Sequence, residues 1–263
     1  MCFMKLDIYY IDAFSSNLFS GNPAAVIFSD LDDEVLMQNI AAENNLSETA
    51  FINTNQNGNH IRWFSPTTEV NLCGHATLAS AYAYFNYISP DETSISFQSA
   101  SGELKVSRTD EVYELDFPKD NFNTIDAIDE VRSATGIEPL ETYLGDINMF
   151  AVFENEKAIE NMNPDFNKVA NLEGQGLIVS SRSIDYDFVS RYFCPKYGIN
   201  EDPVTGSAHT TLIPYWSEKL GKTSMIAKQI SKRGGELFCK NSTTRVYIGG
   251  KAKLYMKGEI KID

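Results

Sequence analysis

Positive charge is scarce in this sequence. Its 263 residues contain 22 Lys and Arg against 36 Asp and Glu, which gives a formal net charge of −14 at pH 7. A surface of this sign repels both a phosphate backbone and an anionic membrane. We therefore expect neither nucleic acid nor a membrane among the partners of the protein. A small anionic substrate is not excluded, because a local site can be positive on a negative protein.

Closely spaced cysteines are also absent. Cys2, Cys73, Cys194 and Cys239 form no C-x-x-C motif, so their spacing predicts neither a zinc site nor a disulfide scaffold. Free thiols are typical of a reducing compartment. The first residues lack the apolar stretch of a signal peptide, and no apolar run is long enough to span a bilayer. These absences predict a cytoplasmic location.

Short strand-like runs dominate the chain, rich in β-branched and aromatic residues and bounded by Gly, Asn, Asp and Ser. Strands are expected at residues 6–11, 24–28, 49–52, 60–65, 94–98, 103–108, 112–117, 149–153, 176–179, 188–193, 225–230 and 245–248. Helical patterns cover residues 33–44, 127–135 and 164–172. This mixture predicts an α+β fold.

Two further helical segments carry no charge. Residues 75–85 are small or apolar on nearly every face, which is typical of a helix that is buried all round. Residues 207–216 are similar, and Gly221 is a plausible residue to end that helix. Among so many short strands, such a segment predicts a helix enclosed by a curled sheet.

The two uncharged segments begin alike, with Gly74-His75-Ala76 in one and Gly206-Ser207-Ala208 in the other. A duplicated unit explains this similarity. We therefore expect two domains, residues 1–117 with Glu48 and the Gly74-His75 helix start, and residues 118–263 with Asp202 and the Gly206-Ser207 helix start. The last strand could instead return to the first domain.

Each of these helix starts could bind an anion. A helix N-terminus presents unpaired N–H groups and the positive end of the helix dipole, and a glycine lets an anion approach the backbone closely. If the two halves face each other, both starts could hold one carboxylate without a lysine or an arginine.

Several groups near these starts can move protons. Glu48 lies at the beginning of an apolar strand, where burial would raise its pKa towards neutrality. His75 lies at a helix start, where the dipole disfavours the imidazolium, and Asp202 and Ser207 lie close to Gly206. From the residues alone, plainer roles stay open: a solvated carboxylate for Glu48, a helix cap for His75 or Ser207, and a turn former for Asp202.

Longer motifs around these residues resemble those of a known family. They cover residues 12–14, 21–26, 46–51, 62–77 and 194–209, in an order and with a length that chance does not explain. They are similar to the signatures of the phenazine-biosynthesis (PhzF-like) isomerase family. Residues 120–175 add little to the resemblance.

The resemblance implies a diaminopimelate-epimerase-like fold, in which two pseudo-symmetric domains each wrap a β-barrel-like sheet around a central helix. It also implies a homodimer and a site in the interdomain cleft. In the founding enzyme of the family, a proton shifts between ring carbons of a dihydro-hydroxyanthranilate.

Carried over residue by residue, the resemblance makes Glu48, His75 and Asp202 catalytic. Gly74, His75, Gly206 and Ser207 would bind the carboxylate of a small cyclic or aromatic-like substrate. No metal and no organic cofactor are implied.

Two other functions stay open. Related racemases and epimerases use one cysteine before each helix-start glycine, whereas this chain has Cys73 before Gly74 but Thr205 before Gly206. A threonine hydroxyl has too high a pKa to replace a thiol, which argues against the two-thiol mechanism but leaves a racemase that uses Cys73 or Glu48. The other alternative is a protein that binds a small carboxylate without turnover.

Overall fold

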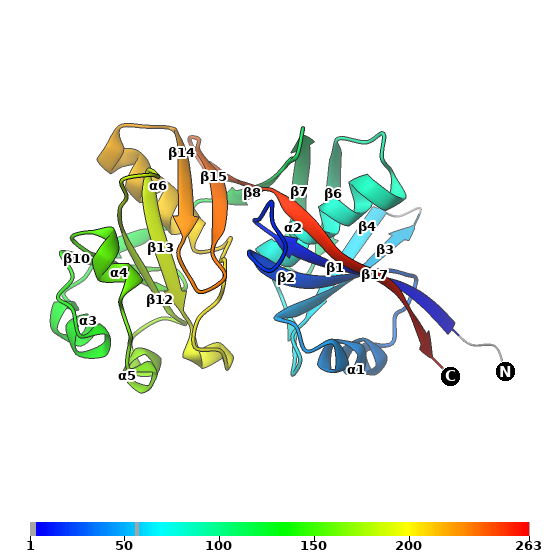
Figure 1. Cartoon of the computed structure of the whole chain (residues 1–263), viewed down its shortest axis with the longest axis horizontal. Coiled ribbons are helices and arrows are strands. Elements are labelled where there is room, and N and C mark those ends of the chain that lie inside the picture. The colour runs from blue at the N-terminus through cyan, green and yellow to red at the C-terminus, as the bar shows by residue number, and fades with distance from the viewer. Residues whose placement is uncertain (1–3, 56–57, 263) are drawn as a thin grey trace. The chain divides into compact units, whose positions relative to one another are not determined.

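The computed structural model describes residues 4–55 and 58–262, and Cys2 lies outside them. The chain divides into two compact units (Figure 1). One contains the chain up to Asp116 together with the residues from Gly249 on, and the other is Phe117–Ile248. The second unit therefore ends at Ile248 rather than at residue 263, because the last strand returns to the first unit.

The first unit is built on a curled sheet. Its strands pair in the order β17-β1-β2-β3-β4-β6-β7-β8, and the short β5 pairs with β4. Their bounds are β1 (Met4–Ala13), β2 (Asn22–Phe28), β3 (Glu48–Asn55), β4 (Gly58–Phe64), β5 (Glu69–Val70), β6 (Ser94–Ser99), β7 (Gly102–Thr109), β8 (Val112–Pro118) and β17 (Ala252–Ile262).

The second unit repeats this plan. Its strands pair in the order β9-β10-β11-β12-β13-β14-β15. From β17 to β7 and from β9 to β15, the successive pairs have the same directions: antiparallel, antiparallel, parallel, antiparallel, parallel, antiparallel. The bounds are β9 (Phe122–Thr124), β10 (Glu141–Gly145), β11 (Met149–Val152), β12 (Leu177–Arg182), β13 (Phe188–Phe193), β14 (Ser224–Gln229), β15 (Gly235–Asn241) and β16 (Arg245–Gly250).

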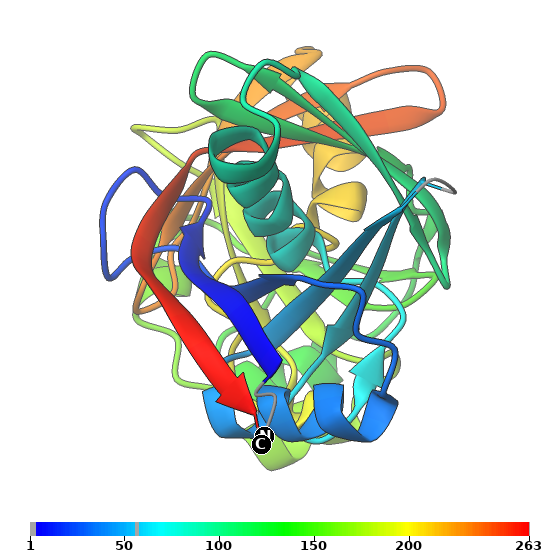
Figure 2. The ribbon, with the colours of Figure 1, turned by 90° about the vertical axis from the view of Figure 1, so that its right-hand side faces the viewer.

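The predicted buried helix of the first unit is α2 (Gly74–Ala83). Every residue of it except Tyr82 is buried, and it packs against β1, β2, β3 and β17, which curl around it in Figure 2. Its buried hydroxyls are satisfied within the helix, since Thr77 Oγ1 donates to the Cys73 carbonyl (2.6 Å) and Ser80 Oγ to the Ala76 carbonyl (2.7 Å). The hydroxyl groups of an uncharged helix can therefore be enclosed without being left unpaired.

The expected extension of this helix to residue 85 is corrected by the structure. After Ala83 the chain continues as a π-helix, η1 (Tyr84–Ile88). Aromatic side chains of this wider turn are packed against the unit. The Tyr87 ring stacks on Tyr9 with centroids 5.0 Å apart, and Phe85 is fully buried.

The uncharged segment predicted in the second unit lies in α6 (His209–Leu220), which begins two residues later than expected and extends further, to include Glu218 and Lys219. Gly221, in the left-handed conformation, ends it as predicted. Pro214 has no N–H to donate to the Thr210 carbonyl. That carbonyl instead accepts from the backbone N–H of Asp120 (3.3 Å), so the proline is accommodated inside the helix.

Three further helices lie close to where the sequence predicted them: α1 (Glu34–Asn44), α3 (Ile128–Thr135) and α5 (Phe166–Asn171). Two short helices were not predicted, α4 (Glu156–Glu160) and η2 (Pro195–Tyr197). Asp33 caps α1 by accepting from the N–H of Leu36 (3.0 Å), and Asp165 caps α5. Among the residues described, none of these helices combines the length and the apolar character needed to cross a bilayer.

The tight enclosure of α2 predicts a large cost for added volume. Ala79 is fully buried, so Ala79→Leu should lower the stability to urea by about 1–3 kcal/mol through overpacking. Val35 on α1 is 71% exposed, and Val35→Leu should change stability by less than about 0.5 kcal/mol. Equal unfolding midpoints for the two variants would contradict the enclosed position of α2.

Candidate active site

An arginine–glutamate pair precedes the buried helix of the first unit. Arg62 on β4 donates from Nε and Nη2 to the two carboxylate oxygens of Glu69, both at 2.7 Å. Glu69 lies opposite Phe64 in the β4–β5 pair, and the Arg62 guanidinium lies 5.1 Å from the Phe64 ring centre. The hydrogen bond from Arg62 holds the pKa of Glu69 below its usual value. This pair fixes the chain five residues before Gly74.

The second unit contains the same arrangement. Arg191 on β13 donates from Nε and Nη2 to Glu201 at 2.7 and 2.9 Å, and Glu201 forms a β-bridge with Phe193. The Arg191 guanidinium lies 4.8 Å from the Phe193 ring centre. Glu201 precedes Gly206 by five residues, as Glu69 precedes Gly74. The two helix starts are thus positioned by equivalent interactions.

Glu48 and His75 come together in the first unit. Glu48 is the first residue of β3 and His75 the second residue of α2, and His75 Nε2 lies 3.2 Å from Glu48 Oε2. Their side chains are 19% and 7% exposed. The two atoms are within hydrogen-bonding distance, although the ring is not aligned for a good hydrogen bond. Burial lowers the pKa of His75 to about 3, so its imidazole is neutral at pH 7.

The other ring nitrogen of His75 faces two side chains. Asn22 Nδ2 lies 3.1 Å and Cys73 Sγ 3.5 Å from His75 Nδ1. Glu48, Cys73 and His75 each place a potential metal-ligand atom within 4.8 Å of the others. Both nitrogens of His75 already face protein groups, however, so a metal ion would have to displace one of them. We therefore assign no metal to this cluster.

Asp202 is held at the helix start of the second unit. The Thr205 hydroxyl donates to the Asp202 carboxylate. Gln229, which is fully buried, donates to the Asp202 carbonyl (2.7 Å) and accepts from the Thr205 N–H (2.9 Å). Thr205, the residue that corresponds to Cys73, thus has a hydroxyl group bonded to Asp202 in place of a thiol. Sequence reasoning missed Gln229, because nothing distinguishes a glutamine within a strand until the fold is known.

Gly206 and Ser207 do not begin the α-helix, as the sequence predicted, but a turn before it. The Gly206 and Ser207 carbonyls accept from the N–H groups of His209 (3.0 Å) and Thr210 (3.1 Å), a spacing of three residues. A turn of this kind, like the first turn of α2, leaves its first N–H groups without partners inside the helix. Anion binding by Gly206 and Ser207 therefore stays a prediction.

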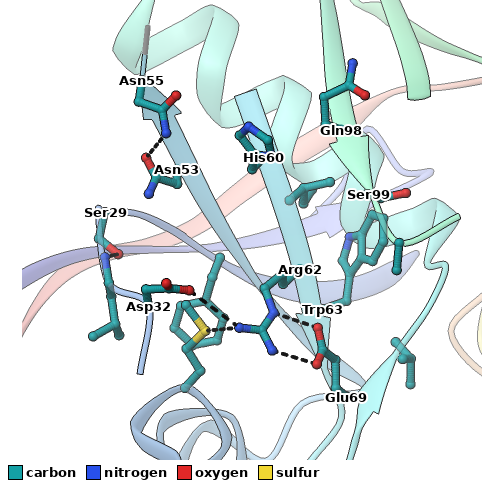
Figure 3. A pocket seen from close by; sticks show the side chains of 16 residues that line it. Ser29, Asp32, Asn53, Asn55, His60, Arg62, Trp63, Glu69, Gln98 and Ser99 are labelled. Atoms are coloured by element: carbon teal, nitrogen blue, oxygen red, sulfur yellow. Dashed lines mark hydrogen bonds and ion pairs between the residues drawn. The ribbon is translucent and has the colours of Figure 1, made fainter. Parts of the chain in front are cut away.

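The structure groups the predicted residues by unit: Glu48, Gly74 and His75 in the first, and Asp202, Gly206 and Ser207 in the second. The two other histidines are not among the predicted residues. His209 is fully buried, with Nδ1 2.8 Å from the Thr205 carbonyl oxygen. His60 lines a cavity of about 640 Å³ together with Arg62 and Glu69 (Figure 3). None of the six predicted residues lines that cavity.

The arginine that lines this cavity is already paired. Figure 3 shows the Arg62 side chain directed at Glu69. Its guanidinium also donates to Glu34 (3.1 Å) and lies 3.9 Å from Asp32. Because Arg62 is used in these ion pairs, we do not assign the chemistry to the cavity.

Comparison with known proteins agrees with the motifs. Residues 11–258 match the family described as "Phenazine biosynthesis-like protein" (PhzC-PhzF). The chain belongs to the PhzF-like isomerase family. It is 46% identical to an uncharacterized isomerase of Pseudomonas aeruginosa over 99% of this chain and 100% of that one. It is 47% identical to a PhzF-family crystal structure from Enterococcus faecalis, with a TM-score of 0.95 over 98% and 99% of the two chains.

A more distant likeness concerns the fold alone. A hydroxyproline epimerase from Agrobacterium vitis aligns with this PhzF-like chain at a TM-score of 0.62 and 9% identity, over 98% of this chain and 93% of that one. Together with the repeated strand order, this likeness confirms the predicted epimerase-like fold with two pseudo-symmetric units.

The burial of neutral histidines predicts a pH dependence of stability. Burial lowers the pKa of His209 in the folded PhzF-like chain to about 4, below the value of about 6.5 in an unfolded chain. Between these two pKa values the unfolded state therefore binds more protons than the folded state. The free energy of unfolding should decrease as the pH is lowered below about 6.5, by about 1.4 kcal/mol per pH unit for each such histidine. When the free energy of unfolding is measured with urea between pH 4.5 and 6, its dependence on pH should be weaker for His209→Gln than for wild type.

The matched control for this experiment is His60→Gln, because His60 is exposed and should leave the slope unchanged. Identical slopes for His209→Gln and wild type would show that the folded chain does not exclude the imidazolium at position 209.

Proposed function

We propose that this PhzF-like isomerase moves a proton between two carbons of a small cyclic carboxylate, without a metal or an organic cofactor. The observation that carries this proposal is the 3.2 Å approach of Glu48 Oε2 to the neutral imidazole of the buried His75. A largely enclosed carboxylate beside a neutral donor fits a general base that must first accept a proton and later release it.

The proposed reaction needs only one proton and one electron pair. The Glu48 carboxylate takes the proton from one carbon, and the C–H electron pair is delocalised into the unsaturated ring of the substrate. Glu48 then returns the proton to a second carbon, so that a double bond shifts and no atom is gained or lost. His75 donates from its N–H group to Glu48 or to a polar group of the substrate during this cycle.

The helix starts would hold the substrate. We propose that backbone N–H groups at Gly74, His75, Gly206 and Ser207 bind its carboxylate, which the uncharged starts can do through N–H groups and helix dipoles alone. Asp202, fixed by Thr205 and Gln229, would accept a hydrogen bond from a polar group of the same substrate.

Loss of the Glu48 carboxylate should strongly slow proton transfer. In D₂O, with a panel of cyclic unsaturated carboxylates, mass spectrometry should detect carbon-bound deuterium for wild type. The rate should fall by about 10²–10⁴-fold for Glu48→Gln, the usual contribution of a general base. Glu43→Gln is the control, because Glu43 is exposed on α1 and should exchange at the wild-type rate.

Two other results would point elsewhere. Deuterium uptake that survives Glu48→Gln but is lost in Cys73→Ser would indicate a thiol mechanism of the racemase type, for which the 3.5 Å distance between Cys73 Sγ and His75 Nδ1 is the supporting observation. Carboxylates that raise the melting temperature without any uptake would indicate a binding protein.

A further inference from the structure

A buried asparagine contacts His75 on the side away from Glu48. Asn22 begins β2 and is fully buried, and its Nδ2 lies 3.1 Å from His75 Nδ1. Its position is set by the preceding residue. Gly21 has φ +71°, and a Cβ there would lie 2.2 Å from the Ala13 carbonyl oxygen, so no other residue fits without a shift of the backbone.

We propose that Asn22 is a positioning residue that keeps the proton of the neutral His75 ring on Nε2, the nitrogen that lies 3.2 Å from Glu48 Oε2. This inference rests on the proposed function, since it assigns a part in the same proton transfer. Asn22 acts through His75 and is not itself assigned a contact with the substrate.

The argument starts from the hydrogen-bonding capacity of imidazole. A neutral ring carries one proton, so one nitrogen donates and the other accepts. The Asn22 amide N–H can only donate, and the Cys73 thiol on the same side can donate as well. With Nδ1 accepting from these groups, the proton must be on Nε2.

Glu48 requires the same arrangement. An ionised carboxylate accepts hydrogen bonds and cannot donate them. If Asn22 were reversed, so that its Oδ1 faced Nδ1, the proton would move to Nδ1. The bare Nε2 would then face the carboxylate 3.2 Å away, and two acceptors would repel each other. An ionised Glu48 therefore selects the orientation in which Asn22 donates.

His209 provides a contrast within the same chain. Its Nδ1 lies 2.8 Å from the carbonyl oxygen of Thr205, which can only accept, so its proton must be on Nδ1. The two buried histidines are therefore expected to carry their protons on opposite nitrogens, although both are neutral.

This placement has a consequence for catalysis. An N–H group this close to Glu48 favours its ionised form before proton abstraction and restricts the orientation of the carboxylate. With the proton on Nδ1 instead, both effects would be lost while the ring kept its place. Asn22→Asp should produce that state, because a carboxylate of the same shape can only accept from Nδ1.

The tautomers can be read without a substrate. In full-length protein labelled with ¹⁵N-histidine, long-range ¹H–¹⁵N correlation spectra at pH 7 distinguish the two neutral forms, and the chain has three histidines to assign. His60→Gln and His209→Gln identify the signals. Wild type should show His75 protonated on Nε2 and His209 on Nδ1. In Asn22→Asp, only the His75 pattern should change.

A buried asparagine in the second unit provides the matched control. Asn148 accepts from the Tyr192 hydroxyl (2.8 Å), so Asn148→Asp also introduces a buried carboxylate but should leave the His75 spectrum unchanged. His75 protonated on Nδ1 in wild type would overturn the proposal, and this reading stands even if Asn22→Asp does not fold.

Kinetics separate this proposal from the proposed function. With a substrate found by deuterium uptake, Asn22→Asp should lower kcat by about 10²–10⁴-fold and leave KM nearly unchanged. The expected spectra combined with a wild-type kcat in Asn22→Asp would refute the positioning role alone. A failure of Glu48→Gln to slow turnover would refute the proposed function, whatever the spectra show.

Discussion

In each unit, a bidentate ion pair between a strand arginine and a glutamate precedes the start of the buried helix. Arg62 with Glu69 and Arg191 with Glu201 fix the chain five residues before Gly74 and Gly206. An Arg–carboxylate pair with two parallel hydrogen bonds fixes direction as well as distance. The helix starts can therefore be uncharged, because their placement depends on charges several residues away.

The distance in sequence between the ion pairs and the helix starts explains how a chain with a net charge of −14 could still bind an anion at those starts. Arg62 and Arg191 are paired within the scaffold, and the proposed ligands of the anion are backbone N–H groups. Burial keeps His75 neutral beside Glu48, so the candidate site of the first unit contains a proton donor without a fixed positive charge. Such a pair can exchange a proton at a lower cost than a permanent ion pair, which would hold Glu48 ionised.

The sequence predicted the features that carry a hydrophobic or a motif signal. All the expected strands are present, with shifted ends, and the uncharged composition of α2 correctly predicted its enclosure. The strands β5, β9, β10, β15 and β17 were not predicted. None of the residues of β17 is buried, so it carries no hydrophobic signal, and it pairs with β1. The roles of Asn22 and Gln229 depend on contacts with residues distant in the sequence. Asn22 contacts His75, 53 positions away, and Gln229 contacts Thr205, 24 positions away. The predicted homodimer and cytoplasmic location stay predictions.

The central proposal is that the helix start of each unit binds a carboxylate through its backbone N–H groups. Its most direct test is a titration of ¹⁵N-labelled protein with anthranilate, followed through the backbone amide signals of Gly74, His75, Gly206 and Ser207. We predict that all four signals shift and reach saturation as the anion is added. Signals of the Gly74–His75 pair or of the Gly206–Ser207 pair that do not shift would contradict the proposal.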